Sequence, residues 1–384
     1  DRTVDDLTAT YNTTGPTVET AVAWYRNDTP ECILYLPFEG GTSTSLDDYS
    51  GNGNHASATG EPATTPTWDP TGGPNGSGAY IFDGNDYFIT GDIFPINSSY
   101  TKTAWVSVTA TVGDYRNIIS SIYNGDNDHH FKVNPDGTLN AGHSFGAPIV
   151  QDPVPLTAAT WYFVAVTFDY ATGDMVLYKD GVEIDRNVVE TSLRTIVDEA
   201  VQIGARDNNW GWDGSMDEPR IYHRALSAEQ ISSLFTNGND LVLAEETRGD
   251  DVWFVDVTPF STSGPGSRVR SNSLTIQGPA ISGLILDASS AQIRITDLLT
   301  SSFTPNSSVT ETATTWLRNG DPDCLLFLPF EGGSANTLLD FSGSNNHVSF
   351  TETMASRPAW DATGGPDGNG AFVFDGDDYL LAGD

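Results

Sequence analysis

The sequence predicts an all-β protein of antiparallel sheets that holds one full repeat unit and the beginning of a second. Apolar residues alternate with polar ones in short runs such as ECILYLPF, TWYFVAVTFD and DVWFVDVTP, which is the period of half-buried strands. The 69 residues from Trp24 to Asp92 return without a gap from Trp316 to Asp384, with over half of the positions identical. The two copies begin 292 residues apart, so the repeating unit is a domain or a domain pair rather than a solenoid turn. We therefore expect the chain to be a segment of a longer tandem array.

The composition suits a turn-rich protein with real cores. Of the 384 residues 38% are hydrophobic, and 38 glycines and 21 prolines supply turns. The net charge of -35 repels phosphate backbones and anionic membranes, so nucleic acid is a poor partner. Calcium is a natural counter-charge. The alternative is that the acidic residues only keep an exposed fibre soluble.

The two cysteines, Cys32 and Cys324, occupy equivalent places in the two copies. A disulfide within one domain is therefore excluded, and each is expected to be a buried free thiol, with an inter-chain bridge as the alternative. No signal peptide and no apolar run of 18 residues is visible, so we expect no membrane insertion in this segment. A Thr/Ser/Asn-rich composition and five Asn-x-Ser/Thr sequons favour an extracellular, cell-surface setting.

The stretch from Ile33 to about Leu234 is predicted to form one all-β domain. Its strands are ILYLPFEG, GAYIFDG, TKTAWVSVTATV, NIISSIYNG, HHFKVNPDGTLNAGH, TWYFVAVTFDYATGDMVLYKDGVEI, AVQIGARD and GSMDEPRIYHRAL. Hairpin turns are expected at Thr172-Gly173 and Asp180-Gly181. One helix is predicted in SAEQISSLFTNG, with Ser227 as the N-cap and Gly238 after its end.

These pieces occur in an order that resembles the laminin-G-like, concanavalin A-like jelly-roll family. The resemblance rests on LPFEGG, the loop DYSGNGNH, the strand end FDGNDY, the pair WYFVAVTFD and LYKDG, and above all MDEPRIYHRALSAEQI. It covers about 200 residues. It implies two packed antiparallel sheets whose rim loops bind ligands in some members.

The segments that flank this domain have too few strands to close a core separately. DLTATYNTTGPTVETAVAWYRN ends with Val22 and Trp24 on one face, and GDDVWFVDVTP places Trp253, Val255 and Val257 on one face. Together they resemble the two halves of an immunoglobulin-like sandwich without its cysteine pair. We therefore infer a jelly roll inserted into a discontinuous immunoglobulin-like domain. The predicted boundaries are 1–28 and 241–278 for that domain, 29–240 for the jelly roll, 279–320 for the second immunoglobulin-like half and 321–384 for the start of the second jelly roll.

A calcium site is predicted at the loop from Asp48 to Asn54. Calcium prefers six to eight hard oxygens, and a glycine-rich loop with Asp and Asn at its ends can wrap an ion. The second copy keeps Asp340 and Asn346. The family resemblance suggests that Asp217 adds a third ligand. The alternative is an Asx-turn loop without an ion.

Two further segments are weaker candidates. NGDNDHH, with Asp126, Asp128, His129 and His130, resembles the start of a calcium loop, but we expect a solvated hairpin tip there. The ligand platform is predicted at Asn209, Trp210 and Trp212, because exposed tryptophans stack on sugar rings. Alternatively, these tryptophans pack against the final strands.

Catalysis has little support in the sequence. Glucanases of this fold carry an E-x-D-x-x-E run, and the nearest segment here, from Glu183 through Asp185, ends in Val188. Glycoside hydrolysis lacks its acid and its nucleophile without a carboxylate pair. We expect a non-catalytic structural or adhesive repeat of an extracellular surface protein or filament. Its partners would be neighbouring repeats or copies of the same chain. The alternative is a calcium-dependent, lectin-like module that binds carbohydrate.

Overall fold

The computed structural model describes the chain in segments. These are residues 6–58, 65–94, 97–110, 113–121, 129–143, 149–191, 200–206, 209–278, 281–288, 299–305, 312–318, 321–330, 338–350, 357–361, 363–365, 370–374 and 378–382. The chain divides into two compact units, each of which is described by itself. One unit comprises residues 7–242 and 252–274, and the other comprises residues 1–6, 243–251 and 275–384.

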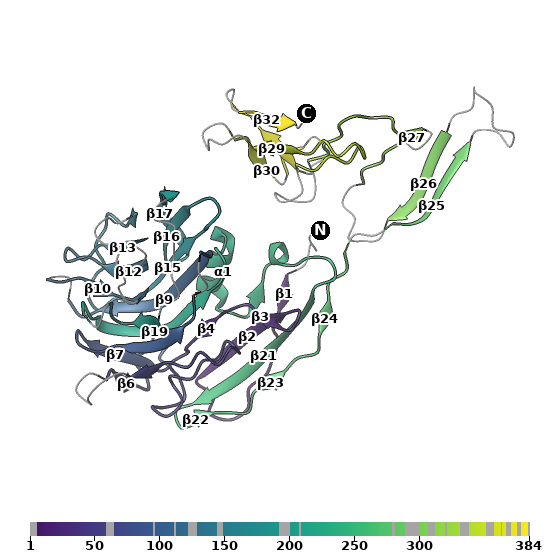
Figure 1. The fold of residues 1–384 in the computed structure, drawn as a ribbon. Coiled ribbons are helices and arrows are strands. Elements are labelled where there is room, and N and C mark those ends of the chain that lie inside the picture. Colours follow the sequence, from purple (N-terminus) through teal and green to yellow (C-terminus); the bar gives the residue numbers. More distant parts are fainter. Residues whose placement is uncertain are drawn as a thin grey trace. The chain divides into compact units, whose positions relative to one another are not determined.

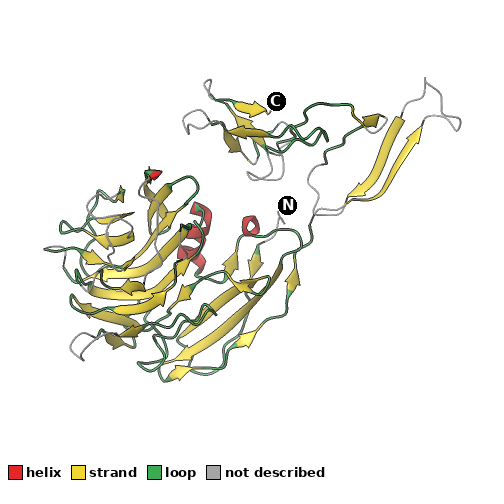
Figure 2. Ribbon diagram, viewed as in Figure 1, coloured by secondary structure: helices red, strands yellow, loops and turns green. Residues whose placement is uncertain are grey.

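The described residues form a nearly all-β, antiparallel structure, which confirms the predicted class (Figure 2). The largest sheet has eight strands in the order β17-β16-β15-β9-β19-β7-β6, with β4 paired to β19. Its strands are β4 (Leu34–Tyr35), β6 (Thr67–Asp69), β7 (Ala79–Asp83), β9 (Tyr100–Val108), β15 (Tyr162–Phe168), β16 (Asp174–Lys179), β17 (Val182–Val188) and β19 (Asp213–Tyr222). The predicted turn at Asp180-Gly181 joins β16 to β17, and both residues have positive φ.

Two four-stranded sheets complete the sandwich (Figure 1). Their strands are β5 (Ser57–Ala58), β8 (Phe88–Asp92), β10 (Arg116–Asn117), β11 (Ile119–Ser121), β12 (His129–Val133), β13 (Leu139–His143), β14 (Val150–Gln151) and β18 (Ala200–Ile203). The orders are β10-β12-β13-β14 and β11-β18-β8-β5. The main core takes Phe131 and Ile203 from these sheets and Val106 and Val164 from the large sheet, all fully buried. This arrangement is a concanavalin-like β-sandwich.

The predicted helix is confirmed as α1 (Ala228–Asn237). Ser227 caps it in a capping box with Gln230, and Gly238 follows its end with positive φ. Ile231 and Leu234 bury the apolar side of the helix beside Phe163 and Tyr178 of the large sheet. Because these side chains lie on the face of the sheet opposite the main core, the sheet is covered on both sides.

A second sheet is built from the segments that flank the sandwich in the sequence. Strand β2 (Glu19–Arg26) pairs antiparallel with β21 (Val252–Ser261) over eight residue pairs, from Glu19–Phe260 to Arg26–Trp253. The sheet also holds β3 (Thr29–Pro30), β22 (Gly264–Pro265), β23 (Val269–Arg270) and β24 (Leu274–Thr275). Beside it, β1 (Leu7–Thr8) pairs with β20 (Leu241–Val242). The chain thus enters and leaves the sandwich through neighbouring strands (Figure 1).

This second sheet shares a core with the sandwich. Ala21 of β2 and Phe260 of β21 belong to the same buried cluster as Tyr35, Tyr178 and Ile231. Tyr49 packs edge-on against Phe260, with ring centroids 4.9 Å apart. Trp24 and Val255, opposite each other in the ladder, are both buried. Whether the sheet is immunoglobulin-like stays a prediction.

The described part of the other unit contains a short 3-10 turn, η4 (Ala244–Glu246), and two-stranded sheets. The pairs are β25 (Ile281–Ala288) with β26 (Leu299–Pro305), β27 (Leu317–Arg318) with β28 (Asp321–Pro322), β29 (Val348–Phe350) with β32 (Leu380–Ala382), and β30 (Ala359–Asp361) with β31 (Ala371–Val373). No closed sandwich occurs among these described residues.

Equivalent residues of the two copies differ in burial. Trp24 is 7% exposed and Trp316 41%, while Ile33 is 7% exposed and Leu325 78%. In the first copy the Ile33 N–H donates to the Ile221 carbonyl of β19, and the Trp24 indole donates to the Asn239 carbonyl. The cysteines follow the same pattern. Cys32 is buried as predicted, and burial raises the pKa of its thiol to about 12. Cys324 is exposed, so the prediction of burial is wrong there.

Candidate functional site

The predicted calcium loop is closed by its own hydrogen bonds. The Asp48 carboxylate accepts bonds from the backbone N–H groups of Tyr35, Ser50 and Asn54 and from the Ser50 hydroxyl, at 2.8 to 3.0 Å. Each carboxylate oxygen takes two of these bonds, which fills the four acceptor positions of the group. The Asn54 amide donates to the Ile33 carbonyl. A calcium ion at this loop would have to displace at least one protein donor.

The second copy repeats this geometry. Asp340 accepts from the backbone of Phe327, Ser342 and Asn346 and from the Ser342 hydroxyl, and the Asn346 amide donates to the Leu325 carbonyl. Burial by itself raises the pKa of Asp340, but the hydrogen bonds outweigh it and hold the pKa well below its ordinary value. The same contacts therefore form in both copies, although Ile33 is 7% exposed and its equivalent Leu325 is 78% exposed.

Asp217 lies among other acidic side chains. It is buried in β19, at the bulge where the register between β19 and β9 shifts. Burial raises its pKa well above the ordinary value, and Glu218 and Glu39 raise it further. Burial also raises the pKa of Glu39 to about 7, although Ser77 and Gly78 donate to its carboxylate. Asp217 and Glu39 are therefore two neighbouring carboxyl groups whose pKa values burial raises.

Two backbone carbonyl oxygens and the Asp217 carboxylate crowd Gly73. A Cβ atom on Gly73 would meet the Asp217 Oδ2 at 2.8 Å, the Gly78 carbonyl oxygen at 2.8 Å and the Ser77 carbonyl oxygen at 3.1 Å. Position 73 therefore requires glycine. Carboxylate and carbonyl oxygens gathered in this way can share a proton or hold a hard cation. No group of three or more His, Cys, Asp or Glu side chains suited to a metal occurs among the described residues.

One cation lies beside the acidic residues. Arg220 is buried, bonds Glu218 at 3.2 Å and stacks over Tyr35, with its guanidinium carbon 4.2 Å from the ring centroid. Burial by itself lowers the pKa of Arg220, but Glu218 and Tyr35 raise it well above its ordinary value. Arg220 thus stays charged and offsets part of the negative charge of the cluster.

Glu39 was not among the site residues predicted from the sequence, although its motif occurs in both copies. LPFEGG is identical in both copies, so Glu39 recurs at position 331. Only an opening strand was predicted for this motif. Its acidic residue was not linked to Asp217 because the two lie 178 positions apart in the sequence and meet only through the sheet. Glu331 itself lies outside the described residues.

The predicted ligand platform is divided between the core and the surface. Trp212 is fully buried and donates from Nε1 to the Ser215 carbonyl, so it packs in the core. Trp210 is partly exposed, and the guanidinium carbon of Arg206 lies 5.9 Å from its ring centroid. Asn209 is exposed, and its side-chain Oδ1 accepts a hydrogen bond from the Trp210 backbone N–H. Of the three predicted residues, only Asn209 and Trp210 are accessible.

The two histidines of the weaker calcium-loop candidate lie in the interior of the sandwich. His129 and His130 are both buried in β12, so a solvated tip is wrong for them; Asp126 and Asp128 lie outside the described residues. His129 Nδ1 lies 2.6 Å from Nζ of the buried Lys102. Burial, and then the charge of Lys102, lower the pKa of His129 well below its ordinary value. The neutral imidazole can therefore accept a hydrogen bond from the lysine inside the sandwich.

The acidic run on β17 has structural partners. Glu183 bonds Arg186, with Nη2 2.8 Å from its carboxylate, and Asp185 accepts from the Gln151 backbone at 2.8 Å. The first contact lies within β17, and the second ties β17 to β14. They give the two carboxylates a role that needs no substrate.

A known protein family matches part of the sandwich. Residues 82–232 match a family model described as Laminin_G_3, the concanavalin A-like lectin/glucanases superfamily. No curated protein matches the chain. No helix among the described residues is long and apolar enough to cross a membrane.

Three similar solved structures have low sequence identity. Domain 4 of AbnA, an extracellular arabinanase of Geobacillus stearothermophilus in complex with arabinotriose, is 20% identical with a TM-score of 0.43, covering 54% of this chain and 98% of that one. The binding domain of Paraclostridial Mosquitocidal Protein 1 is 20% identical with a TM-score of 0.42, covering 53% and 52%. A Trypanosoma rangeli sialidase mutant is 15% identical with a TM-score of 0.41, covering 53% and 32%. The chain thus spans about half of the second protein and a third of the last.

Proposed function

We propose that this chain is a non-catalytic structural and adhesive repeat of an extracellular surface protein or filament. The observation that carries the proposal is the eight-pair ladder between β2 and β21, which closes the chain on both sides of the inserted sandwich. A domain joined in this way projects from its flanking sheet through two strands rather than through one flexible linker. The unit can then recur along a chain without loss of rigidity.

The shared core supports the same role. Phe260 and Ala21 of the flanking sheet pack in one cluster with side chains of the large sheet and α1. Burial of such a cluster resists relative motion of two sheets, because each would expose apolar surface on separation. In this proposal the flanking sheet is one layer of an immunoglobulin-like sandwich, and the jelly roll is its rigid insertion.

The proposal is tested with the 384-residue chain on a glycan array, in calcium and in EDTA, together with assays for released reducing sugar. A structural repeat is expected to give no selective glycan signal and no hydrolysis in either buffer. Selective binding to one glycan class would contradict the non-lectin form of the proposal. Release of sugar that Glu39→Gln or Asp217→Asn abolishes would contradict its non-catalytic form.

A calcium-dependent carbohydrate-binding module is the second candidate. It is favoured by the superfamily match over residues 82–232 and by the accessible Trp210 beside Arg206. An indole face and a neighbouring Asn209 side chain can stack on a sugar ring and bond its hydroxyls. In this case Trp210→Ala is expected to abolish array binding, whereas Trp68→Ala, at a partly buried tryptophan on β6, leaves binding intact in any fraction that folds.

Calcium belongs to either function as a structural ion. We propose the Asp48 loop as its site. The carboxyl oxygens of Asp217 and Glu39 are the alternative site. The ion would supply positive charge to an acidic chain and hold the loop that follows β4. Chelation combined with substitution of Asp48 or Asp217 separates these possibilities.

A further inference from the structure

A cluster of polar side chains joins the two layers of the sandwich inside its apolar core. Lys102 of β9, in the large sheet, is fully buried, and its Nζ donates to the Ile119 carbonyl of β11 at 3.0 Å. The same Nζ lies 2.6 Å from Nδ1 of His129 on β12. Tyr100, also on β9, bonds Nε2 of His143 on β13 at 3.0 Å. Strand β9 belongs to one layer and β11, β12 and β13 belong to the other, so we call Lys102, Tyr100, His129 and His143 the layer clamp.

The bond from Lys102 requires a neutral His129. A neutral imidazole has one protonated nitrogen and one acceptor nitrogen, so Nδ1 accepts from the lysine and Nε2 carries the proton. This Nε2 is buried and has no hydrogen-bond partner among the described residues. A second proton would bind at Nδ1, where it would point at the lysine Nζ and remove an acceptor from it. The pair of Lys102 and His129 is therefore built for a single positive charge.

The surroundings of His129 do not offset a second charge. The titratable groups packed against it are Tyr100 and Lys102 from β9, His143 from β13 and its neighbour His130 on β12, and none of these described groups is a carboxylate. Like charges repel far more strongly in a buried site of low dielectric than in water. Burial, and then the charges of Lys102 and His143, accordingly lower the pKa of His129 well below its ordinary value of 6.5.

His130 acts in the same direction from the opposite face of β12. It is buried, and neither of its ring nitrogens has a hydrogen-bond partner among the described residues. Burial, and then the charges of Lys132 and Arg206, lower its pKa well below 6.5. Both histidines are thus neutral in the folded chain and take up protons on unfolding below pH 6.5. Stability from these groups is present above pH 6.5 and is lost as the pH falls.

We propose that the layer clamp is a pH-sensitive lock, which holds the two layers of the sandwich together at neutral pH and weakens in acid. A proton from solvent changes Nδ1 of His129 from an acceptor to a donor and breaks its bond to Lys102. Two cations then face each other in the core, and they reach water only if the layers separate. The lock goes beyond the structural role, because a rigid repeat needs no response to pH.

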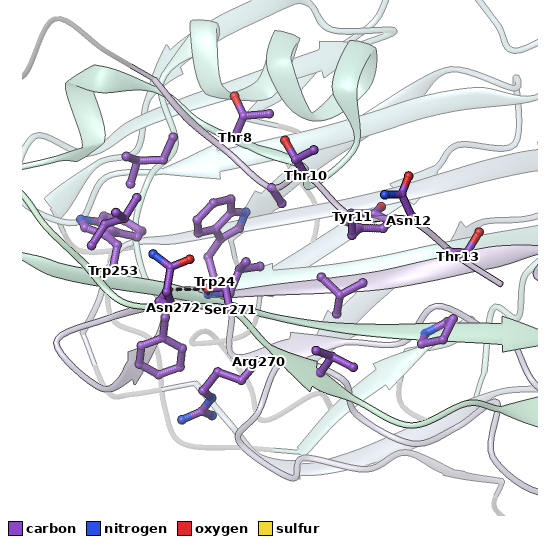
Figure 3. A pocket seen from close by; sticks show the side chains of 18 of the residues that line it. Thr8, Thr10, Tyr11, Asn12, Thr13, Trp24, Trp253, Arg270, Ser271 and Asn272 are labelled. Atoms are coloured by element: carbon purple, nitrogen blue, oxygen red, sulfur yellow. Dashed lines mark hydrogen bonds between the residues drawn. The ribbon is translucent and has the colours of Figure 1, made fainter.

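The test is urea denaturation of the full chain at pH 7.5 and pH 5.5 in EDTA, followed by tryptophan emission. Trp212 is buried in the sandwich, and Trp24 and Trp253 are buried on the flanking sheet, where Figure 3 shows them. His129→Asn places an amide oxygen near the position of Nδ1 and cannot take up a proton. Relative to this variant, the unfolding equilibrium constant of the unmodified chain is expected to rise about tenfold from pH 7.5 to pH 5.5.

Phe131→Leu is the matched control, because Phe131 is a buried core residue of the same strand and does not titrate. It is expected to change the unfolding equilibrium constant by the same factor at both pH values. A ratio of unmodified chain to His129→Asn that stays constant between the two pH values overturns the proposal. So does a ratio of unmodified chain to Phe131→Leu that changes as much as the ratio to His129→Asn.

If His129→Asn fails to fold by circular dichroism, exchange of the histidine C2 protons in the unmodified chain takes its place. The rate of this exchange follows the protonation of each ring, and mass spectrometry measures it in the peptide that holds His129 and His130. The folded chain is expected to show no titration midpoint between pH 5.5 and pH 7.5. A midpoint near 6.5 would mean that the rings titrate as they do in water, and the lock would be wrong. Neither measurement bears on the glycan array, so this inference and the structural role fail separately.

Discussion

At the residue scale, the Asp48 loop shows how one side chain organises a turn. Its carboxylate holds three backbone N–H groups and one hydroxyl, and Asp340 does the same in the second copy. An aspartate that accepts from the backbone two residues on forms an Asx-turn. The spacing was visible in the sequence, but the number of donors was not, because Tyr35 reaches Asp48 from a strand.

The calcium proposal predicts a dependence on chelation. EDTA is expected to lower the melting temperature of the unmodified chain, because an ion bound only to the folded state stabilises it by mass action. Asp48→Ala is expected to melt at one temperature with and without calcium. The substitution itself is expected to lower the free energy of unfolding by about 2–4 kcal/mol, because buried donors lose their carboxylate acceptor. Differential scanning fluorimetry measures both effects.

Asp217→Asn is the matched variant for this experiment. If it removes the response to EDTA while Asp48→Ala keeps it, the ion belongs to the Asp217 and Glu39 oxygens, and the Asp48 site is wrong. An unmodified chain that melts at the same temperature in both buffers contradicts the proposal of a structural calcium.

The raised pKa of Glu39 predicts a dependence of stability on pH. Burial raises this pKa from 4.5 to about 7, so the folded state binds more protons than the unfolded state between these values. Stability from this group is therefore present below about pH 4.5 and is lost as the pH rises through 7. Glu39→Gln stays neutral and keeps an acceptor for Gly78. In EDTA it is expected to match the unmodified chain near pH 5 and to exceed it by about 1–3 kcal/mol at pH 8.

Urea denaturation at the two pH values checks this expectation. The difference between variant and unmodified chain, rather than either curve, carries the result, since other carboxyl groups with raised pKa, such as Asp240, titrate in both proteins. A difference that is equal at pH 5 and pH 8 would mean that Glu39 is charged at both, against the argument from burial.

At the element scale, local signals were reliable where they acted within a few residues. Ser227 and Gly238 bound α1 as predicted, and Asp180-Gly181 makes the predicted turn. The tryptophan motif was ambiguous because periodicity does not tell a buried ring from an exposed one. Trp212 faces the core while Trp210, at positive φ, does not. The electrostatic effect of Glu39 on Asp217 and the burial of His129 depend on long-range packing, which no local pattern contains.

The cap of α1 offers a direct check. Ser227→Ala removes the acceptor for the Gln230 N–H and is expected to lower the free energy of unfolding by about 1 kcal/mol. Ser232→Ala, at an exposed position inside the same helix, is expected to change stability by less than about 0.5 kcal/mol. Equal losses in the two variants, measured by urea denaturation, would show that the cap contributes nothing specific.

The contact between the flanking sheet and the sandwich predicts a larger effect. Phe260 is buried against Tyr49 and belongs to the cluster that includes Ile231 of α1. Phe260→Ala is expected to cost about 3–5 kcal/mol. Hydrogen exchange should rise in β2 and α1 together. Faster exchange confined to β21 would contradict a shared core.

At the scale of the whole molecule, the sequence repeat and the ladder between β2 and β21 give complementary information. The repeat predicted a unit of one domain or a domain pair, and the structure pairs the segments on either side of the sandwich. Exposed residues such as Trp316 and Leu325 have buried equivalents in the first copy. The sequence repeat therefore defines the unit, and the difference in burial shows which residues of the first copy pack against other parts of it.

The central claim is that the inserted sandwich and its flanking sheet form one rigid unit over residues 7–242 and 252–274. Native-state hydrogen exchange of the full chain, followed by mass spectrometry over a urea series, tests it most directly. Peptides from β2 and β21 are predicted to join those from β9 and β15 in a single unfolding transition with one free energy. Exchange of β2 and β21 at a clearly lower free energy, while β9 and β15 stay protected, would contradict the claim.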